Sequence, residues 1–380
     1  MAKEKHRGPG EGSIFQRKDG RWTAFMKVEK TSKRKYYYGK TRAEVRDKLT
    51  AALADQQEGK PPLPEKQTLG QYLESWLRES AQPRVRPRTF ESYSQIVRVH
   101  ILSDNIAKKV LAKLQPQEVQ AFLNAKHASG LSARTVQYIH AIIRTSLNTA
   151  LRWGLLHRNV ATLADPPRVK RQEIEPLTPE QAKVFLDAVR EDRLSALYTV
   201  ALTMGLRQGE ALGLRWADVD LAAGTLRISV ALSQVNGKLQ LVEPKTERSR
   251  RTLHLPDVVA ASLRQHRVRQ VEERLAAGER WQDSGLVFTS TIGTALDPDN
   301  VTHRFQKALL AAGLPRIRFH DLRHSCASLL LAQGAELRTI MEVLGHSQIS
   351  LTANTYAHVM PVLKKDAANK MDALFGGNSG

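Results

Sequence analysis

The sequence predicts a multidomain protein that is mainly α-helical and carries small antiparallel β-sheets. Its 380 residues exceed the usual size of a single domain. Two proline-rich, charged stretches, QQEGKPPLPEK (56–66) and ADPPRVKRQEIEP (164–176), are typical of linkers because proline cannot continue a helix. Helical periodicity dominates elsewhere, and Asp-Gly and Asn-Gly pairs beside short β-like runs indicate hairpins. We therefore expect three domains, at residues 1–60, 67–163 and 176–380.

The charge of the chain indicates the kind of partner. Lys and Arg number 58 against 38 Asp and Glu, a net charge of +20, and residues 1–175 carry +16 of it. This excess favours a polyanion, either nucleic acid or an anionic membrane surface. No run approaches 18 apolar residues, and the N-terminus MAKEKHRGPGEG lacks the apolar core of a secretory signal. With Cys326 as the single cysteine, no disulfide framework is possible, and we expect a soluble cytoplasmic protein with no membrane partner.

The first domain is predicted to be a three-stranded sheet with one helix. Asp19-Gly20 predicts a type I′ hairpin turn, and Trp22, Ala24 and Met26 then alternate with mostly polar residues. A third strand is expected at 33–40 and a helix at 41–55, capped by Thr41. Such a basic domain suits DNA binding through a sheet face, the alternative being a generic basic surface. The candidate contacts are Arg21, Lys27, Lys33, Arg34 and Lys35.

The second domain is predicted to be entirely helical. Thr68 can cap one helix and Ser132 another, a long one. The apolar residues of this long helix recur at helical spacing and are expected to be core: Val136, Ile139, Ile143, Leu147 and Leu151. Basic side chains are spaced to line the outside and are candidate phosphate contacts, which position a protein on a duplex without reading its sequence. They are Arg84, Arg86, Arg88, Arg134, Arg144 and Arg152.

The third domain is predicted to mix helices with a small antiparallel sheet. Thr178 is the expected N-cap of its first helix, with Pro179 at the first helical position and Gln181 closing a capping box. Asn236-Gly237 predicts a hairpin between SVALSQV and KLQLVEP, and RRTLHLP (250–256) a further strand.

Five short segments of this domain carry the candidate chemistry. In TMGLRQGEALGLRW, Gly205 lets the chain turn so that Arg207 lies at a helix N-terminus, with Glu210 three residues on to hold its guanidinium. In EPKTERSRRTLHL, Lys245 falls near a turn between strands. The remaining three are RFHDLRHS with His320 and Arg323 on one helix face, EVLGHS with His346, and ISLTANTYAHV with Tyr356. Each signal is weak alone.

In this order and spacing, the segments resemble the tyrosine recombinase (phage integrase) family. The likeness covers about residues 176–375, while 67–163 resembles that family's core-site-binding domain and 1–60 its arm-site-binding domain. The resemblance implies site-specific cutting and rejoining of DNA through a covalent 3′-phosphotyrosine, to integrate or excise a mobile element. It also implies a homo-tetramer on two double-stranded DNA sites, with possible accessory directionality or DNA-bending proteins. Whether the element is a phage or a transposon stays open.

The resemblance further implies six catalytic residues and one supporting acid. Two arginines would hold the non-bridging oxygens of the scissile phosphate, and a lysine would protonate the departing 5′-oxygen. One histidine would assist proton transfer from the nucleophile, a second would hydrogen-bond the phosphate, and a tyrosine would attack the phosphorus. These are, in turn, Arg207 and Arg323, Lys245, His320, His346 and Tyr356, with Glu210 as the supporting acid.

The residue types themselves agree with this chemistry. Phosphodiester transfer needs negative charge stabilised on the non-bridging and leaving oxygens, and arginine binds such oxygens with a planar fork. The segments supply cations where two-metal enzymes use clustered carboxylates and divalent ions. A phenol, with a pKa of about 10, needs nearby positive charge and a base. We therefore expect no metal and no cofactor, and no ATP because a phosphotyrosine conserves the bond energy.

Three alternatives remain. His320 and His324 have the i, i+4 spacing of a zinc-protease helix, with His346 as a third ligand, but Arg323 lies inside the motif and the general-base glutamate is missing. A non-catalytic DNA-binding protein would not need the complete catalytic set. A type IB topoisomerase shares the mechanism, but the three-domain layout favours an integrase.

The tail 360–375 is apolar enough to pack on its own domain or on a neighbouring subunit.

Overall fold

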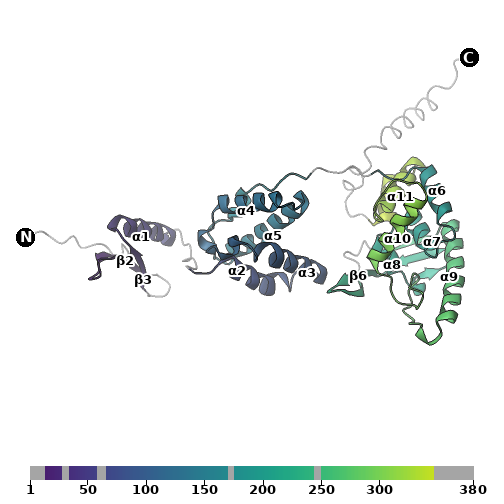
Figure 1. Cartoon of the computed structure of the whole chain (residues 1–380), viewed down its shortest axis with the longest axis horizontal. Helices are drawn as coiled ribbons and strands as arrows, with labels where there is room; N and C mark the ends of the chain where they lie inside the picture. The colour runs from purple at the N-terminus through teal and green to yellow at the C-terminus, as the bar shows by residue number, and fades with distance from the viewer. Residues whose placement is uncertain (1–12, 28–33, 58–65, 170–174, 244–249, 346–380) are drawn as a thin grey trace, which may run out of the picture. The chain divides into compact units, whose positions relative to one another are not determined.

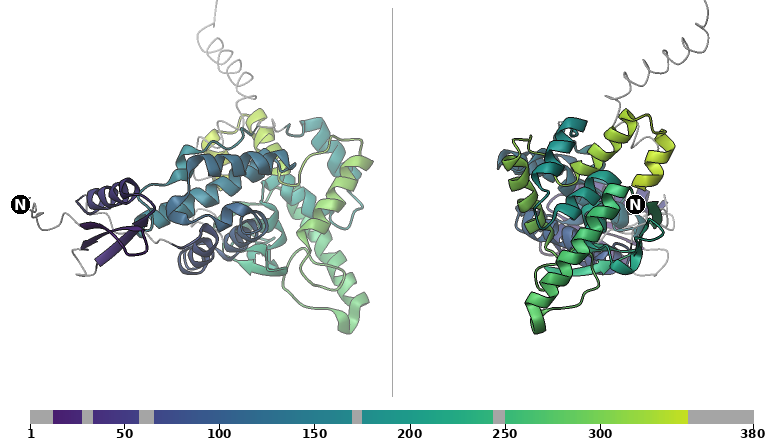
Figure 2. Two further views of the ribbon diagram at one scale, coloured as in Figure 1. Left: turned by 60° about the vertical axis from the view of Figure 1, so that its left-hand side comes forward. Right: turned by 90° about the vertical axis from the view of Figure 1, so that its right-hand side faces the viewer.

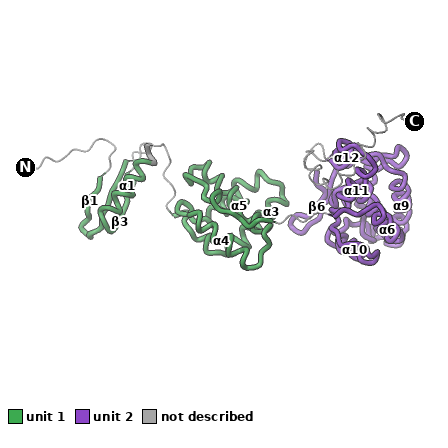
Figure 3. Tube along the Cα trace, turned by 90° about the horizontal axis from the view of Figure 1, so that it is seen from above, with its two compact units in different colours: residues 1–170 green, residues 171–380 purple. Residues whose placement is uncertain are grey.

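The computed structural model describes residues 13–27, 34–57, 66–169, 175–243 and 250–345. The chain forms two compact units, residues 1–170 and 171–380, and the boundary falls inside the predicted linker at 164–176 (Figure 3). Helices dominate both units, and the strands form small antiparallel sheets, as predicted (Figure 1). None of the helices in the described ranges has the length and apolar character that a bilayer crossing needs.

The N-terminal part of unit 1 has the predicted three strands and one helix. They are β1 (Ser13–Gln16), β2 (Trp22–Lys27), β3 (Arg34–Gly39) and α1 (Arg42–Gln57), in the sheet order β1-β2-β3. The helix lies over one face of the sheet, as Figure 2 shows, and the alternation in β2 turns Ala24 and Met26 toward Val45 and Leu49 of the helix. These side chains form a separate small core, and the other sheet face carries Thr23, Phe25 and Lys27.

The first hairpin exists, but its predicted type I′ turn is wrong. Only Gly20 has a positive φ there (+80°), whereas a type I′ turn needs one at Asp19 as well. Arg17 closes the loop through its backbone N–H to the Arg21 carbonyl (2.9 Å), and its own carbonyl accepts from the Gly20 N–H (3.0 Å). The Asp19 carboxylate accepts hydrogen bonds from the backbone N–H and the guanidinium of Arg21. These bonds stabilise a loop that is longer than a two-residue type I′ turn.

The rest of unit 1 is helical, as predicted, around its own core. Thr68 and Ser132 cap their helices as expected, the first with a complete capping box. Val136, Ile139, Ile143 and Leu147 are buried, but Leu151 is 40 % exposed near the helix end, so its assignment to the core was wrong. The helices are α2 (Leu69–Trp76), α3 (Pro87–Ile96), α4 (Pro116–Ala128) and α5 (Ala133–Arg152), with π-helical turns Leu77–Ala81 and Val97–Ile101 and 3₁₀ turns Asn105–Lys108, Leu111–Lys113 and Val160–Leu163.

Unit 2 is a mixed helical and β structure with a large hydrophobic core. Its first helix has the predicted Thr178 cap, Pro179 start and Gln181 capping box. The helices are α6 (Pro179–Ala188), α7 (Ser195–Met204), α8 (Gln208–Leu212), α9 (Asp257–Ala277), α10 (Pro298–Ala311), α11 (Asp321–Ala332) and α12 (Leu337–Leu344), with 3₁₀ turns Trp216–Asp218 and Gly278–Arg280.

In unit 2, the strand that follows the predicted hairpin does not pair with that hairpin. The Asn236-Gly237 turn is of type I′, with φ of 50° and 73°, and joins β6 (Ala231–Val235) to β7 (Lys238–Val242) as predicted. The following strand, β8 (Arg251–His254), pairs instead with β5 (Thr225–Ile228), which also pairs with β4 (Val219–Asp220). The described part of the unit therefore has two sheets, and β4 and β5 were not predicted from the sequence.

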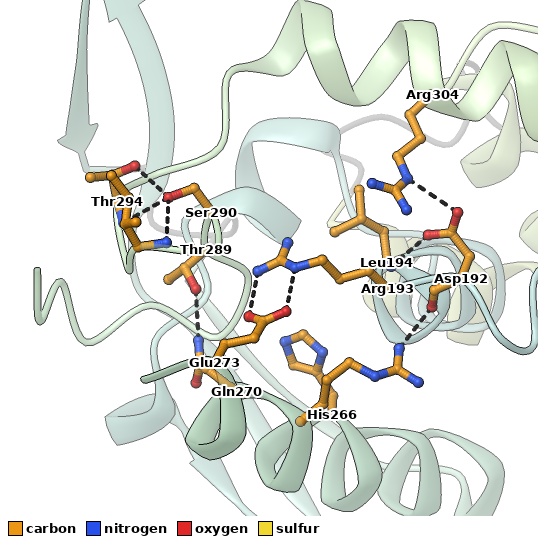
Figure 4. Close-up of polar contacts among 12 residues, drawn as sticks. Asp192, Arg193, Leu194, His266, Gln270, Glu273, Thr289, Ser290, Thr294 and Arg304 are labelled. Carbon is orange, nitrogen blue, oxygen red and sulfur yellow. Dashed lines mark hydrogen bonds and ion pairs between the residues drawn. The ribbon is translucent and has the colours of Figure 1, made fainter. Parts of the chain in front are cut away.

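A polar network fixes the long helix α9 against the rest of unit 2 (Figure 4). The loop before α7 provides Arg193, whose guanidinium makes two hydrogen bonds of 2.5 and 2.6 Å to the Glu273 carboxylate of α9. Both side chains are less than one-fifth exposed. Arg304 of α10 and Arg269 of α9 both donate to Asp192, through its carboxylate and its carbonyl. These bonds tie the loop that leads into α7 to α9 and α10.

Candidate active site

The corner between α7 and α8 places Arg207. Gly205 ends α7 in the left-handed conformation (φ +61°), and Arg207 is the N-cap residue of α8, as the sequence predicted. A Cβ on Gly205 would lie 2.4 Å from a methyl carbon of Leu344 and 3.2 Å from the sulfur of Cys326. Glycine is therefore required both by the backbone angle and by the close approach of α11 and α12.

The Glu210 carboxylate joins two guanidiniums. One oxygen accepts from Nη1 of Arg207 (2.6 Å), the contact that the sequence predicted. The other accepts from the Arg207 backbone N–H and from Nη2 of Arg251, each at 3.1 Å. Burial would raise the pKa of Glu210, but the charges of Arg251 and then Arg207, with the hydrogen bonds of Arg207, outweigh it and lower the pKa. The carboxylate is therefore ionised, although it is only 4 % exposed.

Arg323 lies in the first turn of α11 and is almost completely buried. Its Nη1 donates to the carbonyl of Gly205 (2.7 Å), and its Nη2 donates to the carbonyl of Leu344. The side chain therefore ties α11 to the Arg207 corner on one side and to α12 on the other. Cys326, on the same helix, is buried, and burial raises the pKa of its thiol to about 12.

Three arginines meet at the C-terminal end of α12. The carbonyls of its last turn and cap accept one guanidinium each: Val343 from Arg251 (2.8 Å), Leu344 from Arg323, and Gly345 from Arg207 (3.4 Å). The last carbonyls of a helix have no partners within it and carry a partial negative charge, which favours cations there. One helix end thus gathers side chains from β8, α11 and the α7–α8 corner.

His320 immediately precedes α11 and lies in the electrostatic field of Arg323 and Arg207. Burial, followed by the positive charge of Arg323, lowers the pKa of His320, and Arg207 contributes in the same direction. Its ring meets that of His324 edge to face, with the centroids 5.4 Å apart. Burial, and then the neighbouring His320, lowers the pKa of His324 to about 4. Both imidazoles are therefore neutral near pH 7, and a neutral His320 can accept a proton.

The remaining three catalytic candidates, Lys245, His346 and Tyr356, lie outside the described residues. The described chain stops at Glu243, resumes at Arg250 beside Arg251, and ends at Gly345. The structure thus brings together Arg207, Glu210, His320 and Arg323.

Arg251 was not predicted as a site residue, although it lies in the segment EPKTERSRRTLHL that contains Lys245. Arg251 and Leu253 alternate on one face of β8, and that face is turned inward. A charged residue on the buried face of a strand signals a buried partner, and this signal was present in RRTLHLP. An open cavity of about 480 Å³ borders Arg251 and is lined by further arginines, Arg215, Arg227 and Arg250.

The basic candidates of the N-terminal sheet do not share one face. Lys27 and Arg34 are paired across β2 and β3 on the open face, where the Arg34 guanidinium lies 4.8 Å from the centre of the Phe25 ring. Lys35 lies on the opposite face of the sheet, with its ammonium 5.8 Å from the centre of the Tyr37 ring. Arg21 binds Asp19 at the hairpin, and Lys33 lies outside the described residues.

The basic candidates of the helical part are all exposed. Arg84, Arg86 and Arg88 surround the start of α3, where Arg88 pairs with Glu91. On α5, Arg134 and Arg152 are 18 residues apart, which is five turns, so they lie along one side of the helix. Arg144 is turned away from that line by roughly 80° at 3.6 residues per turn.

The zinc-protease alternative gains no support from this geometry. No group of three His, Cys, Asp or Glu side chains in the described ranges is arranged to hold a metal ion. The carboxylate of Asp321, which stands where the protease motif has glutamate, binds Arg318 instead (2.7 Å).

Comparison with known proteins gives consistent matches. Residues 175–361 match the phage integrase family, and residues 68–127 match the phage integrase N-terminal SAM-like domain. The chain is 34 % identical to a tyrosine recombinase XerC-like protein of Caldanaerobacter subterraneus subsp. tengcongensis, over 90 % of this chain and 92 % of that protein. It is 33 % identical to an integrase of Streptomyces ambofaciens, over 99 % and 98 % of the two chains.

Solved structures share the fold at lower identity. The Tn1549 transposon integrase in complex with transposon right end DNA has a TM-score of 0.68 and 20 % identity, over 82 % of this chain and 100 % of that one. A lambda integrase tetramer bound to a Holliday junction has a TM-score of 0.57 and 18 % identity, over 89 % and 96 % of the two chains.

Proposed function

The chain belongs to the phage integrase family of tyrosine recombinases, and from this we propose how its own residues cut and rejoin DNA. It is a site-specific recombinase of mobile elements. The observation that carries the assignment of residues is the meeting of Arg207 and Arg323 at the end of α12, where Glu210 holds Arg207 and both arginines lower the pKa of His320. Such a cluster matches the needs of a phosphodiester that gains negative charge during transfer.

We propose the following steps. Arg207 and Arg323 bind the non-bridging oxygens of the scissile phosphate, and Glu210 keeps the Arg207 guanidinium in place. The phenolic oxygen of Tyr356 attacks the phosphorus while neutral His320 assists removal of its proton. The bond to the 5′-oxygen breaks, and Lys245 protonates that oxygen. Tyr356 is then linked to the 3′-phosphate, which His346 hydrogen-bonds.

Rejoining is the reverse of these steps. A 5′-hydroxyl attacks the phosphotyrosine, the new phosphodiester forms and the phenol leaves, so that one bond replaces another and no ATP is needed. The charge that divalent ions supply in two-metal enzymes is supplied here by guanidinium, ammonium and imidazole groups. We propose that the reaction therefore proceeds without a metal or any other cofactor.

Covalent trapping tests this proposal. A duplex with a nick close to the cleavage site loses a short strand after cleavage, so the enzyme stays attached. The expected result, in EDTA, is a denaturation-resistant protein–DNA adduct whose protein end maps to Tyr356. Absence of an adduct on the cognate site, or an adduct that requires a divalent ion, would contradict the proposed mechanism.

We also propose an assembly. A lambda integrase, which shares the fold, forms a tetramer on a Holliday junction. This chain is proposed to act likewise as a homo-tetramer on two double-stranded DNA sites in the bacterial cytoplasm, with accessory directionality or DNA-bending proteins as further partners. The tail 360–375, outside the described residues, is proposed to pack on its own domain or on a neighbouring subunit.

The three proposed domains divide the contacts with DNA. Residues 67–163 are proposed to hold the core site through Arg84, Arg86, Arg88, Arg134, Arg144 and Arg152. Residues 1–60 are proposed to bind arm sites through Arg21, Lys27, Lys33, Arg34 and Lys35. Lys27, Arg34 and Phe25 share the open sheet face, where cations and an aromatic ring are available to a duplex.

Deletion of residues 1–60 tests this division. Because the deletion removes a net charge of +8, binding to arm-site DNA is expected to weaken about tenfold or more at physiological salt. The rate of core-site cleavage is expected to persist, since the catalytic candidates lie after residue 200. Binding is measured by titration of labelled duplexes and cleavage by trapping. Loss of core cleavage would show that the proposed domain boundary is misplaced.

The pH dependence of cleavage tests the role of His320. Burial and Arg323 lower the pKa of His320 below its ordinary value of 6.5, so the imidazole stays in its proton-accepting form below that pH. Single-turnover cleavage is therefore expected to keep its rate as the pH falls through 6.5 and to decline only at lower pH. A rate that is already halved at or above pH 6.5 would contradict the proton-accepting role.

A further inference from the structure

Arg251 is a buried charge that the steps above do not use. It opens β8, where it pairs with Ile228 of β5, and its side chain is only 8 % exposed. Burial of a guanidinium is costly, and a well-packed apolar side chain is often as stabilising in such a place. A buried arginine on the inner face of a strand therefore indicates a specific role for the groups that it binds.

Two hydrogen bonds of Arg251 connect the carboxylate that holds Arg207 with the end of α12. Its Nη2 donates to Glu210 (3.1 Å), on the oxygen that also accepts the Arg207 backbone N–H. Its Nε donates to the carbonyl of Val343 in the last turn of α12 (2.8 Å). One planar fork thus fixes the distance between the carboxylate that holds Arg207 and the helix end against which Arg207 rests.

The charge of Arg251 matters as well as its shape. Of the two guanidiniums at Glu210, that of Arg251 is the more deeply buried, whereas the Arg207 side chain is 38 % exposed. Without Arg251, Arg207 would be the one guanidinium in the described part of the chain that is paired with the Glu210 carboxylate. The Arg207 guanidinium would then be drawn toward the carboxylate and away from a phosphate, which competes for the same donors.

We propose that Arg251 is a positioning residue for DNA strand cleavage, which orients the Arg207 guanidinium by sharing Glu210 with it and by fixing the end of α12. The inference rests on the proposed function, because Arg207 is assigned there to the scissile phosphate. Arg251 itself does not touch the DNA in this proposal. Its loss changes the chemical step and leaves DNA affinity unchanged.

Three variants test the proposal in the full-length chain. Arg251→Met removes the charge and the hydrogen bonds to Glu210 and Val343, and Arg251→Lys keeps the charge but loses the planar fork of donors. Arg250→Met is the matched control, since Arg250 lines the same cavity but pairs with Glu243 at the surface. For each variant, the dissociation constant for the core duplex and the single-turnover cleavage rate are measured separately, together with the melting temperature.

The expected result is a split between binding and chemistry. Arg251→Met and Arg251→Lys should bind the core duplex with the wild-type dissociation constant and cleave it about 100-fold more slowly, the effect of a displacement of roughly 1 Å at a reacting group. Arg250→Met should match the wild type in both. Equal loss of binding and cleavage would make Arg251 a DNA contact, and an unchanged cleavage rate would show that it has no part in catalysis. Either result overturns the proposal.

Two further measurements separate positioning from simple destabilisation. Guanidinium chloride, below the concentration that unfolds the chain, should enter through the cavity beside Arg251 and restore part of the cleavage rate of Arg251→Met, but not of Glu210→Gln. In addition, Arg251→Met should slow the Glu210→Gln variant far less than it slows the wild type, because it acts through that carboxylate. Absence of rescue, or fully additive rate losses, would overturn the proposal.

These outcomes are distinguishable from failure of the proposed function. If the wild-type chain forms no covalent adduct, the proposed function fails before any variant is compared. If the wild type forms the adduct and Arg251→Met forms it at the same rate, only the positioning role fails. Should Arg251→Met not fold, Arg251→Lys, which keeps the buried charge, gives the same comparison.

Discussion

Replacement of Tyr356 by phenylalanine is expected to abolish strand cleavage and leave DNA binding unchanged. Phenylalanine keeps the ring and removes only the oxygen that is proposed to attack the phosphorus. The guanidiniums that are proposed to hold the phosphate come from other segments, so affinity does not depend on this oxygen. The measurements are trapping on the nicked duplex, where no adduct is expected, and titration of the intact duplex, where the wild-type dissociation constant is expected.

A second tyrosine provides the control. Tyr198 is completely buried, and its hydroxyl has no hydrogen-bond partner among the residues that the structure describes. Tyr198→Phe is therefore expected to cleave at the wild-type rate. An adduct formed by Tyr356→Phe would show that another group is the nucleophile. Loss of binding in that variant would mean that Tyr356 has a structural role instead.

Replacement of Glu210 by glutamine is expected to damage both stability and catalysis. Glutamine keeps the shape of the side chain but leaves Arg207 and Arg251 without their shared negative charge. Breaking a buried ion pair by removal of one partner costs about 3 kcal/mol or more. The free energy of unfolding of unit 2 should fall by about that amount, and the single-turnover cleavage rate should fall about 100-fold because Arg207 is no longer held.

The same substitution at a surface pair is the control for Glu210. Glu342 pairs with Arg338 on α12, and both side chains are largely exposed. Exposed pairs contribute little, so Glu342→Gln should change the free energy of unfolding by less than about 0.5 kcal/mol and should not change cleavage. Urea unfolding and trapping measure the two effects. A Glu210→Gln enzyme of wild-type stability and rate would contradict the role assigned to this carboxylate.

Local signals were sufficient for much of the fold. The caps at Thr68, Ser132 and Thr178, and the Asn236-Gly237 turn, involve only residues within three or four positions of one another, so the sequence displays the whole interaction. The predicted type of the Asp19-Gly20 turn was wrong for a reason that is also local but that the Asp-Gly pair alone does not indicate. The Asp19 carboxylate binds Arg21, and only the glycine adopts the left-handed conformation.

The features that were not predicted from the sequence depend on contacts between distant segments. Strand β8 pairs with β5, about 25 residues earlier, rather than with the adjacent hairpin, and no turn residue marks that pairing. Arg251 meets a carboxylate 41 positions away and a carbonyl 92 positions away. Arg207, Glu210, His320 and Arg323 were found because their segments resemble a known family, whereas hydropathy alone gives no reason to bring them together. Lys245, His346 and Tyr356 stay predictions.

The end of α12 couples the positions of three arginine side chains. Since three arginines from separate segments rest on successive carbonyls of one short helix, a shift of that helix along its axis disturbs all of them at once. We therefore expect the three hydrogen bonds to be lost or kept together, so that a displacement of α12 alters the placement of all three guanidiniums in a single step.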